Sequence, residues 1–599
     1  MKEPRIHISD NRKFARRKVD TAFVIKNLLK YLKPYLPLFI IVFLANLAAV
    51  ALSLLGPKLS GQAIDLIKPD GSTDLNGIWY YCALLTGVYV VSGLITYLSS
   101  VGMAYVARRM VKKMRNDTFE KLISLPVSYF DSRQAGDIIS VLSYDIDTVG
   151  ESLANDITLV LKSVVLIVGS LVMMLTIAAP LVLVFVVTIP LSLIFTRYLA
   201  KRVQPLFRKR SAKLGELNGF VEEMISGQKT TKAYNCESKV IADFERKNRD
   251  AVDAYAQAEY LSTITGPAVN FINNLALTLV SVFGALAYMY AVGGISVGQI
   301  SSFVLYSRKF SGPINEIANV IGEFQSAIAA AERVFRVLEE EPEKPDCDGA
   351  VALEKVDGKV ELKNVSFGYV AGKTVIKDFS LTAEKGELIA IVGRTGAGKT
   401  TVINLLMRFY DPDSGTISID GKDVTKITRS SLRKSFTMVL QDTWLFAGTV
   451  YENIAYGKEN ATREEVERVC KAAKIHSFIA RLPDGYDTCL ADGALNISKG
   501  QKQLLTIARA MLLDSPMLIL DEATSNVDTR TEHIIQAAMT KLMEGRTCFV
   551  IAHRLSTIKN ADKILVMENG NVVEQGTHES LMAAKGAYYN LYHSQFESY

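Results

Sequence analysis

The chain falls into two halves that differ in their pattern of apolar and polar positions. In the first half, four apolar runs carry no charged residue, at 36–57, 78–107, 163–196 and 260–307. About 20 apolar residues in a helix cross a bilayer core of about 30 Å, so each of the first two runs fits one crossing. The other two are too long for one straight helix and fit two crossings each. A buried soluble core does not give four runs of this length, and we expect six crossings.

Lysine and arginine residues gather in alternate connections between the expected crossings. The basic segments are the N-terminal arm, 108–133 and 197–232. The connections with few basic residues are 58–77 and the expected turns at 178–180 and 293–296. Cytoplasmic connections of membrane proteins carry an excess of lysine and arginine. We therefore expect both termini in the cytoplasm.

The composition agrees with a membrane protein. Hydrophobic residues make up 49% of the chain and the net charge is +6, while the mean hydropathy is +0.18 and the pI about 8.7. The basic residues lie beside apolar runs, which favours a membrane surface over nucleic acid as their partner. The six cysteines form no Cys-x-x-Cys pair, so neither a disulfide framework nor a cysteine metal site is expected. No removable signal peptide is expected after the basic arm.

Three segments outside the crossings are expected to be helical. Residues 24–33 are apolar on one face and lysine-rich on the other, which suits a helix in the membrane interface and equally an ordinary surface helix. The long connections 108–156 and 197–259 each fit two helices that run out of the membrane and back. Their tips, near 125–136 and 220–234, would then reach a cytoplasmic domain.

Two basic residues interrupt the last expected crossing. Arg308 and Lys309 lie about four helical turns from the outer connection. A charged residue inside a crossing is costly and suggests a function, such as lining an aqueous path. The alternative is that these side chains reach the interface or pair with Glu316, about two turns further on. The sequence leaves both interpretations open.

A glycine-rich turn in the second half joins an apolar run at 388–392 to a helical pattern at 401–406. It matches G-x-x-x-x-G-K-[ST], the phosphate-binding loop, and consists of Gly393, Arg394, Thr395, Gly396, Ala397, Gly398, Lys399 and Thr400. Such a loop turns backbone N–H groups toward phosphates at a helix N-terminus, whereas the alternative is a glycine turn without a ligand. We expect these residues and Thr401 to bind ATP, with Lys399 on the β- and γ-phosphates and the Thr400 hydroxyl on Mg²⁺.

A later apolar run, 517–520, ends in two acids, Asp521 and Glu522. They would stand at the C-terminal end of a buried strand, where an α/β sheet binds its ligand. We expect Asp521 to help hold Mg²⁺ and Glu522 to polarise the attacking water. Further strands are expected at 359–369, 386–392 and 416–420.

Together these features resemble the ATP-binding cassette (ABC) exporters of the half-transporter type, particularly bacterial multidrug and lipid exporters. The specific element is the segment 496–503, which is similar to the family signature Leu-Ser-Gly-Gly-Gln and precedes Asp521. The resemblance covers nearly the whole chain. It implies an all-α membrane domain of six helices followed by an α/β P-loop ATPase domain. The implied divisions are an arm and interfacial helix at 1–35, the membrane domain at 36–325, a linker at 326–358 and the nucleotide-binding domain at 359–599.

The resemblance also implies roles for single residues. Tyr369 resembles the aromatic residue that stacks on adenine, Gln441 the glutamine that contacts Mg²⁺ and the lytic water, and His553 the switch histidine on the γ-phosphate. The implied catalytic residues are Glu522, His553 and Gln441. The implied Mg²⁺ ligands are Thr400, Gln441 and Asp521. The signature residues that would contact the ATP of a partner are Ser498, Lys499, Gly500 and Gln501, and the loop that crosses to the partner contains Asp528.

In such exporters two nucleotide-binding domains close head to tail, and each ATP lies between one chain's phosphate loop and the other's signature. The two cytoplasmic tips are similar to the coupling loops that the closure moves. Lys499 replaces the first glycine of the usual signature pair, and one extra residue stands between Gly493 and the signature. Because Glu522 and His553 are intact, we expect the catalytically intact subunit of a heterodimer. A homodimer that tolerates Lys499 is the alternative.

The resulting hypothesis is an ATP hydrolase coupled to transport in a multi-pass protein of the bacterial plasma membrane. The substrate would be a hydrophobic or amphipathic drug, lipid or peptide that leaves the cytoplasm or the inner leaflet. The expected partners are ATP, Mg²⁺, a second half-transporter and membrane lipid, but not nucleic acid. An importer, an ATP-gated channel or a sensor on the same scaffold are the alternatives. The six expected crossings argue against a soluble ABC ATPase.

Overall fold

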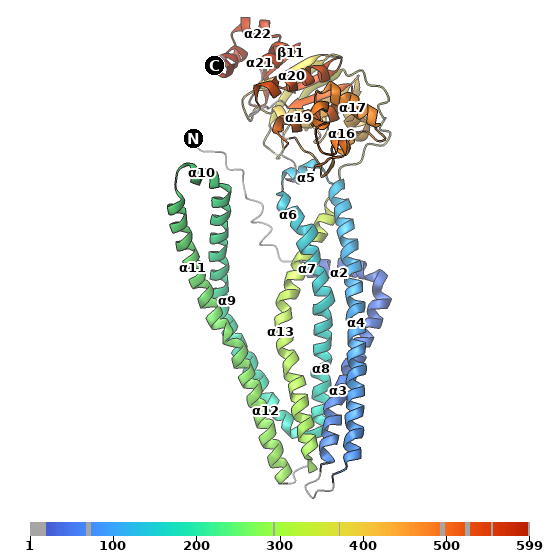
Figure 1. Cartoon of the computed structure of the whole chain (residues 1–599), viewed down its shortest axis with the longest axis vertical. Helices are drawn as coiled ribbons and strands as arrows, with labels where there is room; N and C mark the ends of the chain where they lie inside the picture. Colours follow the sequence, from blue (N-terminus) through green and yellow to red (C-terminus); the bar gives the residue numbers. More distant parts are fainter. Residues whose placement is uncertain are drawn as a thin grey trace. The chain divides into compact units, whose positions relative to one another are not determined.

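The computed structural model describes residues 20–67, 73–290, 294–370, 372–441, 443–490, 497–521, 528–552 and 555–596. Its contacts divide the chain into two compact units. The first unit comprises 1–123 and 135–340, and the second comprises 124–134 and 341–599. Figure 1 shows long helices in the first unit and sheets covered by helices in the second. The expected order, a helical domain followed by an α/β domain, is confirmed.

The apolar runs of the first unit lie in long helices, which are α3 (Leu36–Asp65), α4 (Leu75–Ser124), α8 (Ile157–Ala178), α9 (Leu183–Ser226), α12 (Thr265–Met289) and α13 (Val297–Glu339). Among the described residues, the helical stretches long and apolar enough to cross a membrane are Thr21–Asp65, Leu75–Ser124, Ala135–Ser226 and Glu237–Met289. The third contains both α8 and α9. The 3₁₀ turn η4 (Ala179–Val182) separates them, which confirms the turn expected near Pro180. α13 is not among the four stretches, so the count of six crossings stays a prediction.

The two helical arms expected from the sequence are present. α4 continues to its end at Ser124 and is followed by the short helices α5 (Val127–Asp131) and α6 (Ala135–Ser140). α9 leads through α10 (Gln228–Ala233) into α11 (Glu237–Thr263), which lies beside α9 (Figure 1). Lys213 of α9 lies 3.4 Å from the carboxylate of Asp250 on α11. The connections 108–156 and 197–259 therefore run out and back as helices.

The helix expected at 24–33 is α2 (Thr21–Leu32), which begins after the capping residue Asp20. It packs against α13, because the rings of Phe23 and Tyr31 lie 6.3 and 6.0 Å from that of Phe335. The Tyr31 hydroxyl also donates to Asp117 at 2.8 Å. Packing of one face against α13 is compatible with an interfacial helix and with a surface helix, so both interpretations stay open.

Side chains of α13 donate to backbone carbonyls of α3. Pro57 lies inside α3 and has no N–H, so the carbonyl of Ser53, one turn earlier, lacks its helical donor. Lys309 Nζ donates to this oxygen at 3.0 Å, and the neighbouring Tyr306 hydroxyl donates to Leu54 O at 2.5 Å. An unpaired backbone group is costly in an apolar environment. Lys309 therefore compensates for the proline in the facing helix.

The second unit is built on two main sheets. A mostly parallel sheet has the strand order β12-β11-β3-β10-β9-β6, and an antiparallel sheet has the order β2-β1-β4-β5. The parallel sheet consists of β3 (Leu388–Gly393), β6 (Phe436–Val439), β9 (Met517–Asp521), β10 (Thr547–Ile551), β11 (Lys563–Glu568) and β12 (Asn571–Gly576). The other consists of β1 (Val360–Phe367), β2 (Ile376–Ala383), β4 (Ser414–Ile419) and β5 (Lys422–Asp423). The strands expected from the sequence are confirmed.

Both faces of the parallel sheet are buried. Ile389 and Ile391 of β3 enter one hydrophobic core, which α14 (Lys399–Leu406) also lines, while Ala390 and Val392 enter a second core beneath α19 (Lys499–Leu513) and α20 (Thr529–Met543). Near-continuous apolar runs are typical of parallel strands covered on both sides. The covered faces leave the C-terminal ends of the strands as the edge that can bind a ligand.

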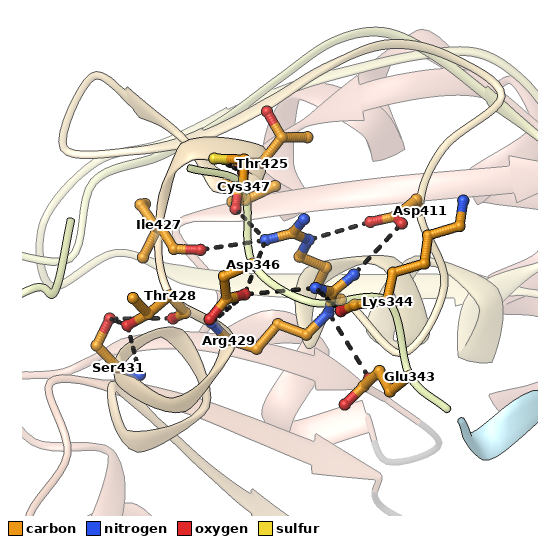
Figure 2. A network of polar contacts seen from close by, with 12 residues as sticks. Glu343, Lys344, Asp346, Cys347, Asp411, Thr425, Ile427, Thr428, Arg429 and Ser431 are labelled. Atoms are coloured by element: carbon orange, nitrogen blue, oxygen red, sulfur yellow. Dashed lines mark hydrogen bonds and ion pairs between the residues drawn. The ribbon is translucent and has the colours of Figure 1, made fainter. Parts of the chain in front are cut away.

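Buried arginine side chains fix the segment after α13 to the second unit. α13 ends at Glu339, so the first part of the linker expected at 326–358 is helical. Arg429, 8% exposed, donates to the carbonyl of Lys344 at 2.7 Å and to the carboxylate of Asp346 at 3.3 Å (Figure 2). A buried guanidinium needs such partners, since removing one of them leaves an uncompensated charge.

Candidate functional site

The expected phosphate-binding loop joins the buried strand β3 to α14. Gly396 and Gly398 have φ angles of 84° and 99°, in the left-handed region that favours glycine. A Cβ atom on Gly398 would also lie 2.7 Å from Ile376 Cδ1. Between them the N–H of Ala397 donates to Arg394 O at 3.1 Å. The loop is thus curled tightly ahead of the N-terminus of α14, as phosphate binding requires.

Lys399 is folded back over this loop. Its Nζ donates to the carbonyls of Gly393 at 2.7 Å and Arg394 at 3.2 Å, and the residue is 9% exposed. Burial lowers the pKa of Lys399, and the charge of Asp521 opposes this effect. A buried ammonium group whose hydrogen-bond acceptors among the described residues are neutral carbonyls favours an anionic ligand nearby. This arrangement fits the phosphates of a nucleotide.

The expected magnesium ligands lie at the C-terminal ends of parallel strands or in the segments just after them. Asp521 is the last residue of β9, and Gln441 follows β6, the neighbouring strand, by two positions. Thr400 is the second residue of α14, the helix after β3, and is exposed. Hydroxyl, amide and carboxylate oxygens are the hard donors that Mg²⁺ takes, usually with only one or two carboxylates. The residues therefore fit Mg²⁺ chemically.

Two of the three expected catalytic residues lie outside the described residues. Glu522 follows the last residue of β9 in the sequence, and His553 follows β10 by two positions. β9 and β10 are parallel neighbours, with Asp521 paired to Ile551. The roles of Glu522 and His553 stay predictions. Gln441, the third, is described and exposed.

Tyr369 is held beside α14 by contacts on two sides. Its hydroxyl donates to Thr401 Oγ1 at 3.2 Å and accepts from Asn404 Nδ2 at 3.1 Å. Its ring meets that of Phe367 at 5.0 Å and, edge to face, that of Tyr410 at 5.0 Å. The residue is 44% exposed, so part of its side chain remains available for an adenine base. The sequence analysis did not predict the contacts of Asn404 and Tyr410 with Tyr369. The available signal for Tyr410 was the aromatic pair Phe409 and Tyr410, shortly after α14.

The signature residues begin α19. Ser498 and Gln501 form a capping box, with Gln501 N donating to Ser498 Oγ at 3.2 Å and Ser498 N to Gln501 Oε1 at 3.0 Å. Gly500 is buried and Lys499 is exposed. Asp528 caps α20 by accepting from Thr531 N at 3.0 Å. Among the described residues, no hydrogen bond joins the signature to the phosphate loop, and the expected contact with a partner's ATP stays a prediction.

Comparisons with known proteins match both halves of the chain. Residues 39–314 match the family described as ABC transporter transmembrane region, and residues 376–525 match the family described as ABC transporter. The chain is 42% identical to the uncharacterised ABC transporter ATP-binding protein YfiC of Bacillus subtilis, covering 96% of this chain and 95% of the relative. It is 40% identical to a fatty acid ABC transporter ATP-binding/permease protein of Mycobacterium tuberculosis, covering 94% and 95%. It is 32% identical to an ATP-dependent lipid A-core flippase of Syntrophus aciditrophicus, covering 96% and 95%.

The chain belongs to the ABC transporters, and within them to the half-transporters of exporter type, with one membrane region and one ATPase domain in a single chain. It is a multi-pass membrane protein that binds ATP and couples ATP hydrolysis to transport.

Replacing Tyr369 with alanine should weaken ATP binding. Stacking of a base on an aromatic ring contributes about 1–3 kcal/mol, which corresponds to a loss of roughly five- to 150-fold in affinity. Tyr369→Phe keeps the ring and serves as the matched control, with a smaller loss expected. Titration of the purified full chain with a fluorescent ATP analogue measures the affinity. An unchanged affinity in Tyr369→Ala would reject the stacking role.

Proposed function

We propose that this chain is half of an exporter that uses ATP to move an amphipathic, lipid-like substrate out of the cytoplasm or the inner leaflet. The observation that carries the proposal is the phosphate-binding loop closed by Lys399, in one chain with long apolar helices. Import, or an ATP-gated channel or sensor, remains the alternative function. Glu522 and His553, the residues expected to support hydrolysis, are both in the sequence and favour a working motor over a sensor.

Two observations favour a lipid over a drug or a peptide. The relatives named above include a fatty acid transporter and a lipid A-core flippase. The second observation is the positive charge at the place where α3, α8 and α13 pack together. Lys309 of α13 has Ser53 O, a neutral carbonyl, as its hydrogen-bond acceptor, and Lys162 of α8 lies within electrostatic range of it. Glu316 Oε2 instead lies 3.5 Å from the Ser163 hydroxyl.

Like charges held close together inside a membrane region are costly, and an anion between them relieves the repulsion. Lys162 also lines an apolar pocket between α3, α4 and α8, together with Val42, Leu47, Val50, Met103 and Leu161. A substrate with one acidic head group suits the two lysines, whereas this pocket, of about 20 Å³, is too small for an acyl chain. We therefore favour an anionic amphiphile such as a fatty acid.

The ATP site would work through positioning and charge. The backbone of the phosphate loop and Lys399 would hold the phosphates, and Thr400, Asp521 and Gln441 would hold Mg²⁺. Mg²⁺ would supply the positive charge that stabilises the transferring phosphoryl group. Glu522 would orient and polarise the attacking water, and His553 would contact the γ-phosphate.

The membrane arrangement is part of the proposal. Six crossings would place both termini, the ATPase unit and the two arm tips in the cytoplasm of a bacterium, with the helices in its plasma membrane. The alternation of basic and less basic connections supports this orientation.

The assembly is proposed to be a heterodimer. Each ATP would lie between one phosphate loop and the partner's signature, and this chain would offer Lys499 in place of a glycine. Lys499 is exposed at the first position of α19, where its positive charge opposes the helix dipole. A partner with a standard signature would then complete the site built on Glu522. A homodimer remains the alternative.

Replacing Glu522 with glutamine should slow ATP turnover by about 10²–10⁴-fold, because a general base contributes about that factor. ATP binding should persist, since glutamine has nearly the same shape. Phosphate release by the purified transporter measures turnover, and Glu544→Gln, an exposed carboxylate, is the control. Turnover near the parent rate would remove Glu522 as the base.

Replacing Lys309 with methionine should weaken stimulation of ATPase activity by a fatty acid about tenfold, the effect of roughly 1.4 kcal/mol of lost attraction. Stimulation by the matching fatty alcohol, which has no charge, should change much less. Lys309→Arg keeps the charge and should retain the preference for the acid. An equal loss for the acid and the alcohol would mean that Lys309 stabilises the contact between α13 and α3 near Pro57 and does not bind an anionic substrate.

Purification from the native host membrane in mild detergent tests the assembly. A heterodimer predicts a second half-transporter at a one-to-one ratio with this chain, measured by mass spectrometry of the intact complex. A chain that pairs with itself and hydrolyses ATP would contradict the heterodimer and would make Lys499 a tolerated substitution.

A further inference from the structure

Tyr410 makes two contacts that the proposed ATP site does not require. It lies four residues after the end of α14. Its hydroxyl donates to Asp131 Oδ2 at 2.7 Å, and its ring meets Tyr369 edge to face at 5.0 Å. Burial, the hydrogen bond to Asp131 and the charge of Asp131 raise the pKa of Tyr410 above its ordinary value. The phenol therefore stays protonated at neutral pH and remains a donor.

The loop that carries Tyr410 is fixed on both sides of this residue. Arg408, 7% exposed with a φ of 50°, donates to the carbonyls of Val424 at 2.8 Å and Ile427 at 3.1 Å. Its Nε donates to Asp411 at 3.0 Å, and Asp411 also lies beside Arg429 in the polar network of Figure 2. The loop is thus anchored on both sides of Tyr410, and the position of the Tyr410 ring depends on its own contacts with Tyr369 and Asp131.

The same aromatic group orients the expected adenine-binding residue. The Tyr369 hydroxyl is bound by Thr401 and Asn404 of α14, whereas its ring is supported by Phe367 and Tyr410. Edge-to-face aromatic pairs contribute about 0.5–1.5 kcal/mol beyond their burial. A base stacked on the exposed side of Tyr369 would fix this ring further and, through it, the ring of Tyr410.

Asp131 is the last residue of α5, the helix at the tip of the first arm. The tip, residues 124–134, packs as part of the second unit. Within it the Arg133 guanidinium lies over the Tyr129 ring at 3.7 Å from its centre, and Glu343 N donates to Ser124 O at 2.9 Å. The Asp131–Tyr410 hydrogen bond therefore joins this tip directly to the aromatic group around Tyr369.

We propose that Tyr410 is a positioning residue that links occupancy of the adenine site to the α5 tip through its hydrogen bond with Asp131. The inference rests on the proposed ATP site and adds the route by which that site acts on the arm. A bound adenine that fixes Tyr369 favours the Tyr410 ring position in which the hydroxyl reaches Asp131. By thermodynamic reciprocity, an engaged α5 must raise the affinity for ATP by the same factor.

Hydrogen–deuterium exchange of the 124–134 peptide tests the link in the full-chain transporter, with and without a non-hydrolysable ATP analogue. The analogue should slow exchange of this peptide in the parent protein. Tyr410→Phe keeps the ring on Tyr369 but removes the donor, and it should abolish that protection. Asp131→Ala should do the same, whereas Asp131→Asn keeps a carbonyl acceptor and should retain it. Asp137→Ala, an exposed carboxylate on α6, is the matched control.

Analogue affinity supplies a second readout. Tyr410→Phe and Asp131→Ala should each weaken the affinity roughly three- to tenfold, the effect of one net hydrogen bond. The double variant should weaken it no further, because both changes remove the same interaction. Protection that survives in Tyr410→Phe, or losses that add in the double variant, would overturn the link. Failure of the ATP site itself would appear separately, as an unchanged affinity in Tyr369→Ala.

Discussion

The expected ATP site of the second unit depends on the hydrogen bonds that the buried ammonium group of Lys399 donates within the phosphate-binding loop. This group lies against two backbone carbonyls, without a carboxylate among its hydrogen-bond partners in the described residues. The strand order brings Asp521 close enough to act on its charge. The sheet therefore holds positive charge at the loop after β3 and negative charge at the end of β9. A nucleotide with Mg²⁺ complements both charges, and neither ligand alone does so.

The helical unit depends on a different constraint, the need to pair every backbone group in an apolar environment. Pro57 leaves one carbonyl of α3 without its helical donor, and Lys309 supplies the donor from the facing helix. This hydrogen bond explains why the apolar helix α13 contains a cation, and the explanation requires no ligand. The acceptor in this contact is a neutral carbonyl, so the positive charge of Lys309 has no carboxylate there. The proposed anionic substrate would supply the opposite charge.

Much of this architecture could be predicted from local sequence patterns. The strand–loop–helix around Lys399, the turn near Pro180 and the helical arms follow from apolar periodicity and from glycine and proline positions. Contacts between distant residues could not be predicted in this way. Asp131 and Tyr410 are 279 positions apart, and neither local pattern indicates the other. The acceptor of Lys309, the carbonyl of Ser53, could not be predicted either, because it is exposed by Pro57 in another helix. The roles of Glu522 and His553 still rest on sequence alone.

Transport by inside-out membrane vesicles tests the central claim most directly. Vesicles that contain the parent protein should take up a labelled fatty acid when ATP is added, and vesicles with Lys399→Ala at equal protein level should not. Uptake that is the same in the two, or that needs no ATP, would contradict an export motor built on this phosphate-binding loop. Export would also be contradicted if ATP drove the fatty acid out of loaded inside-out vesicles, since that direction corresponds to import in the cell.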